Sequence, residues 1–190
     1  MIEETAAGGR ATPAPDAPRR LERSQLVARP IHEVFAFFSE AANLEAITPP
    51  FLHFRILTPM PIAMRAGVHI DYALSLYGVP IRWRTLIARW EPGVCFVDEQ
   101  ESGPFALWRH THEFEARGPS STLMRDTVEY LEPLGPIGRL GHIVFVKRAL
   151  GRIFDFRRDT TARLLAPSAA AQRARSDRNG SQAAVGPEAA

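Results

Sequence analysis

The sequence predicts an α+β fold in which one long C-terminal helix covers the concave face of a seven-stranded, curved antiparallel sheet. Between residues 51 and 133, segments that alternate apolar and polar side chains are separated by turns about every ten residues, a pattern typical of an antiparallel meander. Residues 139–165 lose this period of two and take up helical spacing instead. Because the predicted sheet has one apolar face, we expect the last helix to pack against it.

The start of the folded region predicts one strand followed by two short helices. Residues 20–29 alternate well enough for a first strand. Pro30 suits the first turn of a helix, and apolar residues recur at helical spacing over residues 31–38. Ser39 is expected to cap a second short helix. The Thr-Pro-Pro sequence at residues 48–50 then ends it, because proline cannot continue a helix.

Six further strands are predicted between these helices and the C-terminal helix. They are residues 51–58, 68–77, 81–90, 94–101, 106–114 and 122–133. Alternation places Tyr72 and Trp83 on the apolar face of their strands, and hence toward the interior. Together with the strand at residues 20–29 they complete the seven-stranded sheet.

The composition predicts one folded domain between two tails. Residues 1–19 and 166–190 are rich in Ala, Pro, Ser, Gly and charge, so we expect both segments to be disordered. Residues 20–165 are long enough for one domain with a single core. The lone cysteine, Cys95, excludes an internal disulfide and fits a reducing compartment. With no signal peptide or membrane-spanning run in the sequence, a cytoplasmic protein is expected.

The charge pattern argues against nucleic acid and nucleotide partners. The net charge is +2, and the basic residues are 22 arginines and one lysine. Neither a glycine-rich phosphate loop nor an array of aromatic and basic residues on strands is found in the sequence, so no cofactor and no nucleic acid is expected. The arginines between residues 148 and 163 predict a solvated helix face, which is compatible with weak contact to an anionic membrane surface.

The most informative stretch is "ALWRHTHEF", residues 106–114. Trp108, His110, His112 and Phe114 share one face of this predicted strand, because side chains alternate along a strand. If the following turn is centred near Pro119, the next strand places Asp126 opposite His112, Val128 opposite His110 and Tyr130 opposite Trp108. The preceding hairpin places Asp98 opposite Trp108 or His110, with Gln100 on the same face.

The sequence also resembles the START-like (SRPBCC, helix-grip) superfamily over about residues 20–165. The resemblance rests on element order and on "P-x3-VFAFFS" (30–39), "NLEAITPPFLHF" (43–54), "GVPIRW" (78–83), "EP" (91–92), "FVDEQESGPFALWRHTHEF" (96–114) and "RDTVEY" (125–130). It is greatest to bacterial ligand-binding SRPBCC proteins, polyketide cyclases and coenzyme Q-binding domains. The resemblance implies a helix-grip fold with a cavity between the sheet and the last helix, and leaves carrier and enzyme functions open.

We therefore expect the protein to bind a hydrophobic small molecule, such as a lipid, quinone or polyketide, in that cavity. The candidate ligand-binding residues are Tyr72, Trp83, Phe96, Asp98, Gln100, Trp108, His110, His112, Phe114, Asp126 and Tyr130. The alternative is a cyclase or dehydratase that uses His112 and Asp126 as an acid/base pair. Two other roles stay open for the histidines. One is only to hydrogen-bond the other buried polar groups beneath the helix, and the other is chelation of a metal ion by His110-x-His112 with a carboxylate. Because Trp108 and Phe114 flank them, we predict no metal.

Overall fold

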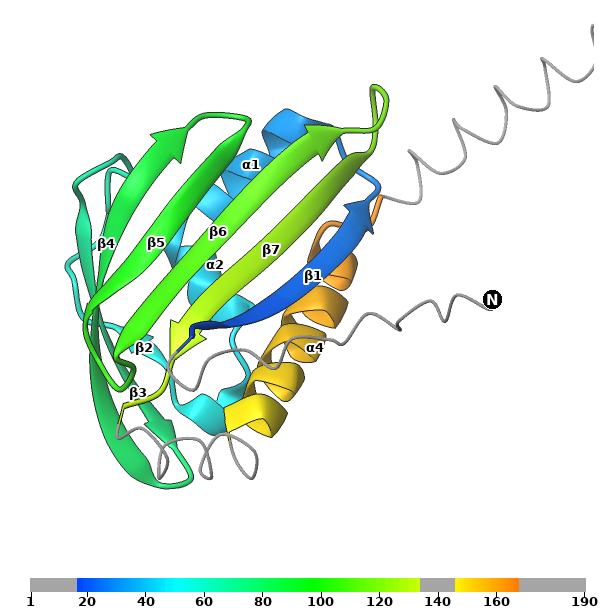
Figure 1. Cartoon of the computed structure of the whole chain (residues 1–190). Helices are drawn as coiled ribbons and strands as arrows, with labels where there is room; N and C mark the ends of the chain where they lie inside the picture. Colours follow the sequence, from blue (N-terminus) through cyan, green and yellow to red (C-terminus); the bar gives the residue numbers. More distant parts are fainter. Residues whose placement is uncertain (1–16, 134–145, 168–190) are drawn as a thin grey trace, which may run out of the picture.

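The structure, a computed structural model, describes residues 17–133 and 146–167. Its elements are β1 (Arg19–Val27), α1 (Ile31–Ser39), α2 (Ala41–Ala46), the 3-10 helix η1 (Pro50–Leu52), β2 (Arg55–Ile56), β3 (His69–Leu76), β4 (Val79–Glu91), β5 (Cys95–Ser102), β6 (Leu107–Ala116), β7 (Thr122–Leu131) and α4 (Lys147–Leu164). The strands form one antiparallel sheet in the order β1-β7-β6-β5-β4-β3-β2. The predicted α+β fold class, with a long C-terminal helix against the curved sheet, is confirmed (Figure 1).

The two ends of the folded region pack close to their predicted limits. β1 begins at Arg19, within the segment expected to be a tail, and the Arg19 guanidinium lies 3.2 Å from the Glu132 carboxylate. At the other end Arg29 donates hydrogen bonds to the carbonyl oxygens of Leu165 and Ala166, 3.1 and 2.7 Å away. The disorder predicted for residues 1–16 and 168–190 lies outside the described residues, as do residues 134–145 of the expected domain.

The strand predicted at residues 51–58 is wrong in its first half. Residues Pro50–Leu52 form a 3-10 helix, and His53 then takes the left-handed conformation with φ 45°. Two consecutive prolines favour the turn at this point, because neither can donate to a sheet ladder. Only Arg55–Ile56 remain in extended pairing, as the edge strand β2.

The cap predicted for the second short helix also differs. Ser39 is the last residue of α1, and its buried hydroxyl has no hydrogen-bond partner among the described residues. The carboxylate of Glu40 caps α2 instead, accepting a hydrogen bond of 3.4 Å from the backbone nitrogen of Ala42. Glutamate can do this because its side chain reaches the exposed amides of the first helical turn.

An irregularity in β4 changes which side chains face the interior. Thr85 and Ile87 are buried, as their alternation predicts. The pairing with β5 shifts between Ile87 and Arg89, as at a β-bulge, and this returns Trp90 to the inner face. There the Trp90 ring lies 5.3 Å from the Phe35 ring and 5.5 Å from the Phe96 ring, between centroids. The bulge therefore brings the Trp90 ring of the sheet into contact with Phe35 of α1.

Three apolar clusters hold the helices onto the sheet. The first, under α1, contains Val27, Val34, Phe35, Phe96, Phe114 and Met124; the second, under α4, contains Val128, Tyr130, Leu150 and Phe154; the third, toward the edge of the sheet, contains Ile70, Tyr72 and Ile87. Burial of this apolar surface is the main force that holds α1 and α4 in place. No helix within residues 17–133 and 146–167 has the length and apolar character needed to cross a membrane.

Candidate functional site

A cavity of about 540 Å³ lies between the concave face of the sheet and the helices. Its wall comes from α1, α2, η1, the strands β3 to β6, and α4. Aromatic side chains make up much of the wall, namely Phe37, Phe38, Phe54, Tyr72, Trp83, Phe96, Phe105, Trp108 and Phe154. Both the volume and the largely apolar lining match those of small-molecule binding sites.

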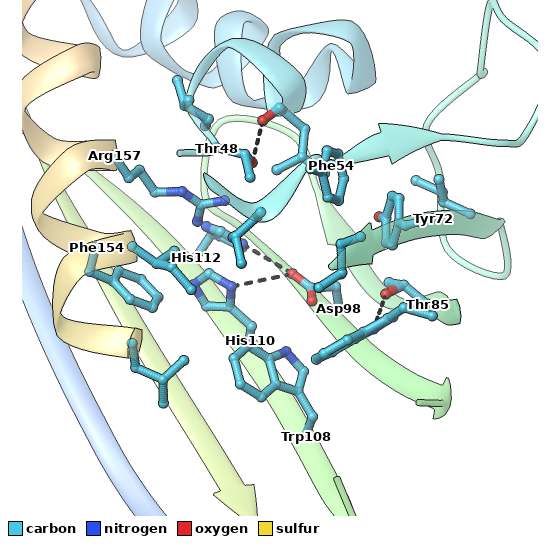
Figure 2. Close-up of a pocket in the computed structure, with 18 of the residues that line it drawn as sticks. Thr48, Phe54, Tyr72, Thr85, Asp98, Trp108, His110, His112, Phe154 and Arg157 are labelled. Carbon is cyan, nitrogen blue, oxygen red and sulfur yellow. Dashed lines mark hydrogen bonds and ion pairs between the residues drawn. The ribbon is translucent and has the colours of Figure 1, made fainter. Parts of the chain in front are cut away.

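The histidines of β6 open onto this cavity. His110 and His112 are 5% and 4% exposed, and both line its wall (Figure 2). The predicted pairing of β6 with β7 is confirmed, because His112 lies opposite Asp126 and His110 lies opposite Val128. Across β5, Asp98 lies opposite His110, one of the two registers predicted. The sheet therefore brings two imidazoles and two carboxylates together.

These four residues, Asp98, His110, His112 and Asp126, form a compact arrangement that we call the His–Asp cluster. Oδ1 of Asp126 lies 2.9 Å from Nε2 of His110, and Oδ2 of Asp98 lies 3.1 Å from Nε2 of His112, both as hydrogen bonds. Nδ1 of His112 lies 2.8 Å from Oδ1 of Asp126, but too far off the N–H direction for a hydrogen bond. Nδ1 of His110 lies 3.6 Å from Oδ2 of Asp98. Each imidazole therefore lies between both carboxylates.

The cluster sets the protonation of its own members. Burial alone would raise the pKa of Asp126, but its contacts with His110 and His112 hold that pKa far below the ordinary value. The pKa of Asp98 is also lowered: the charges of both histidines and the His112 hydrogen bond outweigh burial. Burial and the neighbouring His112 lower the pKa of His110. For His112, the two carboxylates overcome burial and raise the pKa. Both carboxylates are therefore ionised at neutral pH.

Aromatic rings fix the orientation of the two imidazoles. Phe96 stacks on His112 with ring centroids 4.2 Å apart, and Phe154 of α4 meets His110 edge-on at 5.6 Å. The two imidazole centroids are themselves 3.8 Å apart. Such packing leaves the rings little rotational freedom, so one nitrogen of each ring is held toward Asp98 and the other toward Asp126.

Arg157 lines the cavity, although the sequence predicts a solvated helix face for the arginines between residues 148 and 163. Its side chain reaches from α4 toward the histidines (Figure 2). Nε and Nη1 are buried, and neither has a hydrogen-bond partner among the described residues. The sequence does contain a pattern that indicates an inward position, because Arg157 follows Leu150 and Phe154 at the spacing of one helix face.

Seven of the eleven predicted site residues line the cavity, namely Tyr72, Trp83, Phe96, Asp98, Trp108, His110 and His112. The other four do not, for separate reasons. The Gln100 side chain hydrogen-bonds both backbone groups of Phe105 and so closes the β5–β6 turn. Asp126 lies behind the histidines, whereas Phe114 and Tyr130 are buried in the first and second apolar clusters.

The predicted aromatic residues of β3, β4 and β6 shape the far end of the cavity. Trp83 and Trp108 meet edge-on with centroids 5.1 Å apart, and Nε1 of Trp83 donates a 3.1 Å hydrogen bond to the Thr85 hydroxyl. Burial, aided by the charge of Asp98, raises the pKa of Tyr72, so its phenol stays protonated. This end offers a ligand flat apolar walls and few polar groups.

Solved structures share this arrangement of sheet and helices. A START superfamily protein from Mycobacterium smegmatis is 14% identical over 77% of this chain and 96% of that chain, with a TM-score of 0.56. This chain has the START-like fold. The aromatase/cyclase ZhuI from Streptomyces sp. R1128 is 15% identical over 78% and 93% of the two chains, with a TM-score of 0.58.

A third similar structure is the di-domain ARO/CYC BexL from the BE-7585A biosynthetic pathway. It is 22% identical over 76% of this chain and 45% of that chain, with a TM-score of 0.57. No family model and no curated protein matches the sequence. At these identities the structural similarity establishes the helix-grip fold, and the function has to be argued from the site.

Proposed function

We propose that the protein binds a hydrophobic small molecule, of the lipid, quinone or polyketide kind, in the cavity between the sheet and α4. The observation that carries the proposal is an apolar cavity of about 540 Å³ with polar groups gathered on one part of its wall. Sites for small organic molecules combine apolar walls with a few placed polar groups in this way.

The polar part of the wall indicates the chemistry of the ligand. Nε and Nη1 of Arg157 are buried donor nitrogens without partners in the described part of the chain, and leaving such donors unpaired is unfavourable. A ligand oxygen, whether carbonyl, carboxylate or sulfonate, can accept a hydrogen bond from either of them. The ligand therefore has an apolar body against Trp83 and Trp108 and an oxygen-bearing end near Arg157.

A dye-binding titration tests the proposal. The probe is 1-anilinonaphthalene-8-sulfonate, which has an aromatic body and one sulfonate. Ala149, buried in α4 at the cavity wall, is replaced by Phe to occupy the cavity; Ala162→Phe adds the same ring at an exposed position of α4. We expect saturable binding to the wild type and to Ala162→Phe, and at least tenfold weaker binding to Ala149→Phe.

Thermal unfolding of the same proteins shows whether both variants keep a cooperative fold, because loosely packed proteins also bind this dye. Equal dye binding by folded Ala149→Phe and Ala162→Phe would refute binding in this cavity. Displacement of the dye by lipids, quinones and aromatic polyketides of known structure then ranks the three ligand classes.

A cyclase or dehydratase activity is the second candidate function. The observation that favours it is that His110 and His112 line the cavity while Asp126 contacts both rings from behind. Such a pair can remove a proton from carbon with one imidazole and protonate a leaving hydroxyl, which departs as water. Loss of water from a bound polyketide in the wild type, but not in a His112→Gln variant that still binds it, would support this activity.

A further inference from the structure

The His–Asp cluster contains three donor atoms placed as a metal site requires. One donor atom each from Asp98, His110 and His112 lies within 4.8 Å of the other two. Oδ2 of Asp98 lies 3.1 Å from Nε2 of His112 and 3.6 Å from Nδ1 of His110. The ligands of a tetrahedral zinc ion with bonds of about 2.1 Å lie about 3.4 Å apart. Contrary to the expectation of no metal drawn from the sequence, we propose that these three residues bind a divalent transition-metal ion such as Zn²⁺.

Asp126 supplies the support that metal-bound histidines need. Its Oδ1 contacts Nε2 of His110 at 2.9 Å and Nδ1 of His112 at 2.8 Å, the nitrogens on the far side from Asp98. Histidine ligands usually donate the N–H of their other nitrogen to such a carboxylate, which fixes the tautomer and the ring orientation. His110 already makes this hydrogen bond to Asp126, whereas His112 touches Asp126 without alignment and has to turn slightly to donate from Nδ1. With both hydrogens on the Asp126 side, Nδ1 of His110 and Nε2 of His112 present lone pairs toward Asp98.

A purely structural role leaves one contact of the cluster unexplained. Nδ1 of His110 makes no hydrogen bond to a described residue, and Oδ2 of Asp98 lies 3.6 Å from it. When His110 donates from Nε2 to Asp126, that Nδ1 lone pair faces a carboxylate oxygen, which is an unfavourable pairing of two acceptors. A cation between the two atoms converts both into ligands. The same ion replaces the proton that His112 shares with Asp98.

The charge and the position of the site fit this assignment. Asp98 and Asp126 together bring two negative charges into a buried region, and the single positive charge of Arg157 at the cavity wall balances only one of them, so a bound cation is favourable there. Asp98, His110 and His112 all line the cavity, so a fourth coordination position faces it. Two imidazoles and a carboxylate with an open position are the donor set of catalytic zinc and of non-haem iron sites. The site therefore lies where a cavity ligand could reach the metal.

Metal titration of the full-length chain, prepared without a histidine tag and dialysed against chelator, tests the proposal directly. Zn²⁺ binding is measured in competition with a chromophoric chelator, and Co²⁺ binding by its visible absorption. We expect one ion per chain and at least 100-fold weaker binding by Asp98→Asn, which keeps the shape of the side chain. The control is His69→Ala, which removes an exposed imidazole paired with Glu101 at 3.0 Å and should bind like the wild type.

Thermal unfolding of each variant checks that it is folded. Histidine ring signals in NMR spectra of the wild type give a second measurement that depends on no variant: Zn²⁺ should shift those of His110 and His112 and leave the ring of His69 unchanged. Absence of stoichiometric binding, equal binding by folded Asp98→Asn, or shifts confined to other histidines would overturn the proposal. Because the titration uses no organic ligand, its result is independent of the dye-binding experiment.

Discussion

Asp126 lies opposite His112 in the β6–β7 ladder, yet its aligned hydrogen bond goes to His110, whose Nε2 is 2.9 Å from Oδ1. The nearer nitrogen in register, Nδ1 of His112, touches the same oxygen at 2.8 Å without alignment. The Asp126 carboxylate thus contacts two imidazoles, which belong to residues two positions apart on β6. The diagonal arrangement leaves one nitrogen of each ring directed toward Asp98 and the cavity.

Replacement of Asp126 should destabilise the protein by an amount that depends on the new side chain. Asp126→Ala leaves the Nε2–H of His110 buried without an acceptor, and we expect a loss of about 3–5 kcal/mol in the free energy of unfolding. Asp126→Asn keeps an oxygen in place and should lose less. Urea denaturation at pH 7 measures both values. Equal losses for the two variants would show that the negative charge, which both variants lack, matters and that the oxygen kept by Asn cannot replace it.

Arg157→Met should weaken binding of 1-anilinonaphthalene-8-sulfonate while the protein stays folded. Nε and Nη1 of the guanidinium are buried without hydrogen-bond partners in the described chain, so its removal breaks no hydrogen bond of these two atoms to the described residues. A charge-assisted hydrogen bond contributes about 1.5–3 kcal/mol, so we expect binding to weaken about tenfold or more.

Arg158→Met is the matched control for that measurement, because Arg158 is exposed and pairs with Asp155 and Asp159 on the outside of α4. Its affinity for the dye, measured by fluorescence titration, should equal that of the wild type. If both variants lose affinity alike, Arg157 acts only through the overall charge of the helix.

Cys95 should react slowly with thiol reagents. Its side chain is buried, and burial raises the pKa of the thiol, so at pH 7.5 the folded protein holds less thiolate than an unfolded chain does. We expect labelling by iodoacetamide to be at least 100-fold slower in buffer than in denaturing urea. Comparable rates in the two conditions would mean that the β4–β5 turn opens readily.

The register of the central hairpins can be predicted from the sequence, because their turns and their alternation of apolar and polar residues are regular. With the turn placed near Pro119, the pairs His112–Asp126 and His110–Val128 follow from counting, and both are observed. The inward position of Trp90 cannot be predicted by such counting, because the irregularity after Ile87 shifts the alternation of inward and outward side chains in β4. The charge of Arg157 favours a solvated position, so its place at the cavity wall could not be predicted from the sequence, although helical spacing from Phe154 is compatible with the inner face.

The chemistry of the His–Asp cluster could be predicted only in part. Alternation and register bring Asp98, Asp126 and the histidines to one face, but the choice of bonding partner depends on side-chain rotamers. Gln100 shows the same limit: it shares the face of Asp98, and its amide turns back to Phe105 and closes a turn. Residues of one face can therefore line a cavity, lie behind it or serve the backbone.

Native mass spectrometry of the protein purified from its own cells, followed by denaturing extraction, tests the central claim most directly. We predict a reproducible bound mass that is released as an apolar molecule with at least one oxygen-bearing group. The same mass should be absent from Ala149→Phe and present in Ala162→Phe. A wild-type protein that carries no such molecule, and that also fails to bind the dye in its cavity, would contradict the account.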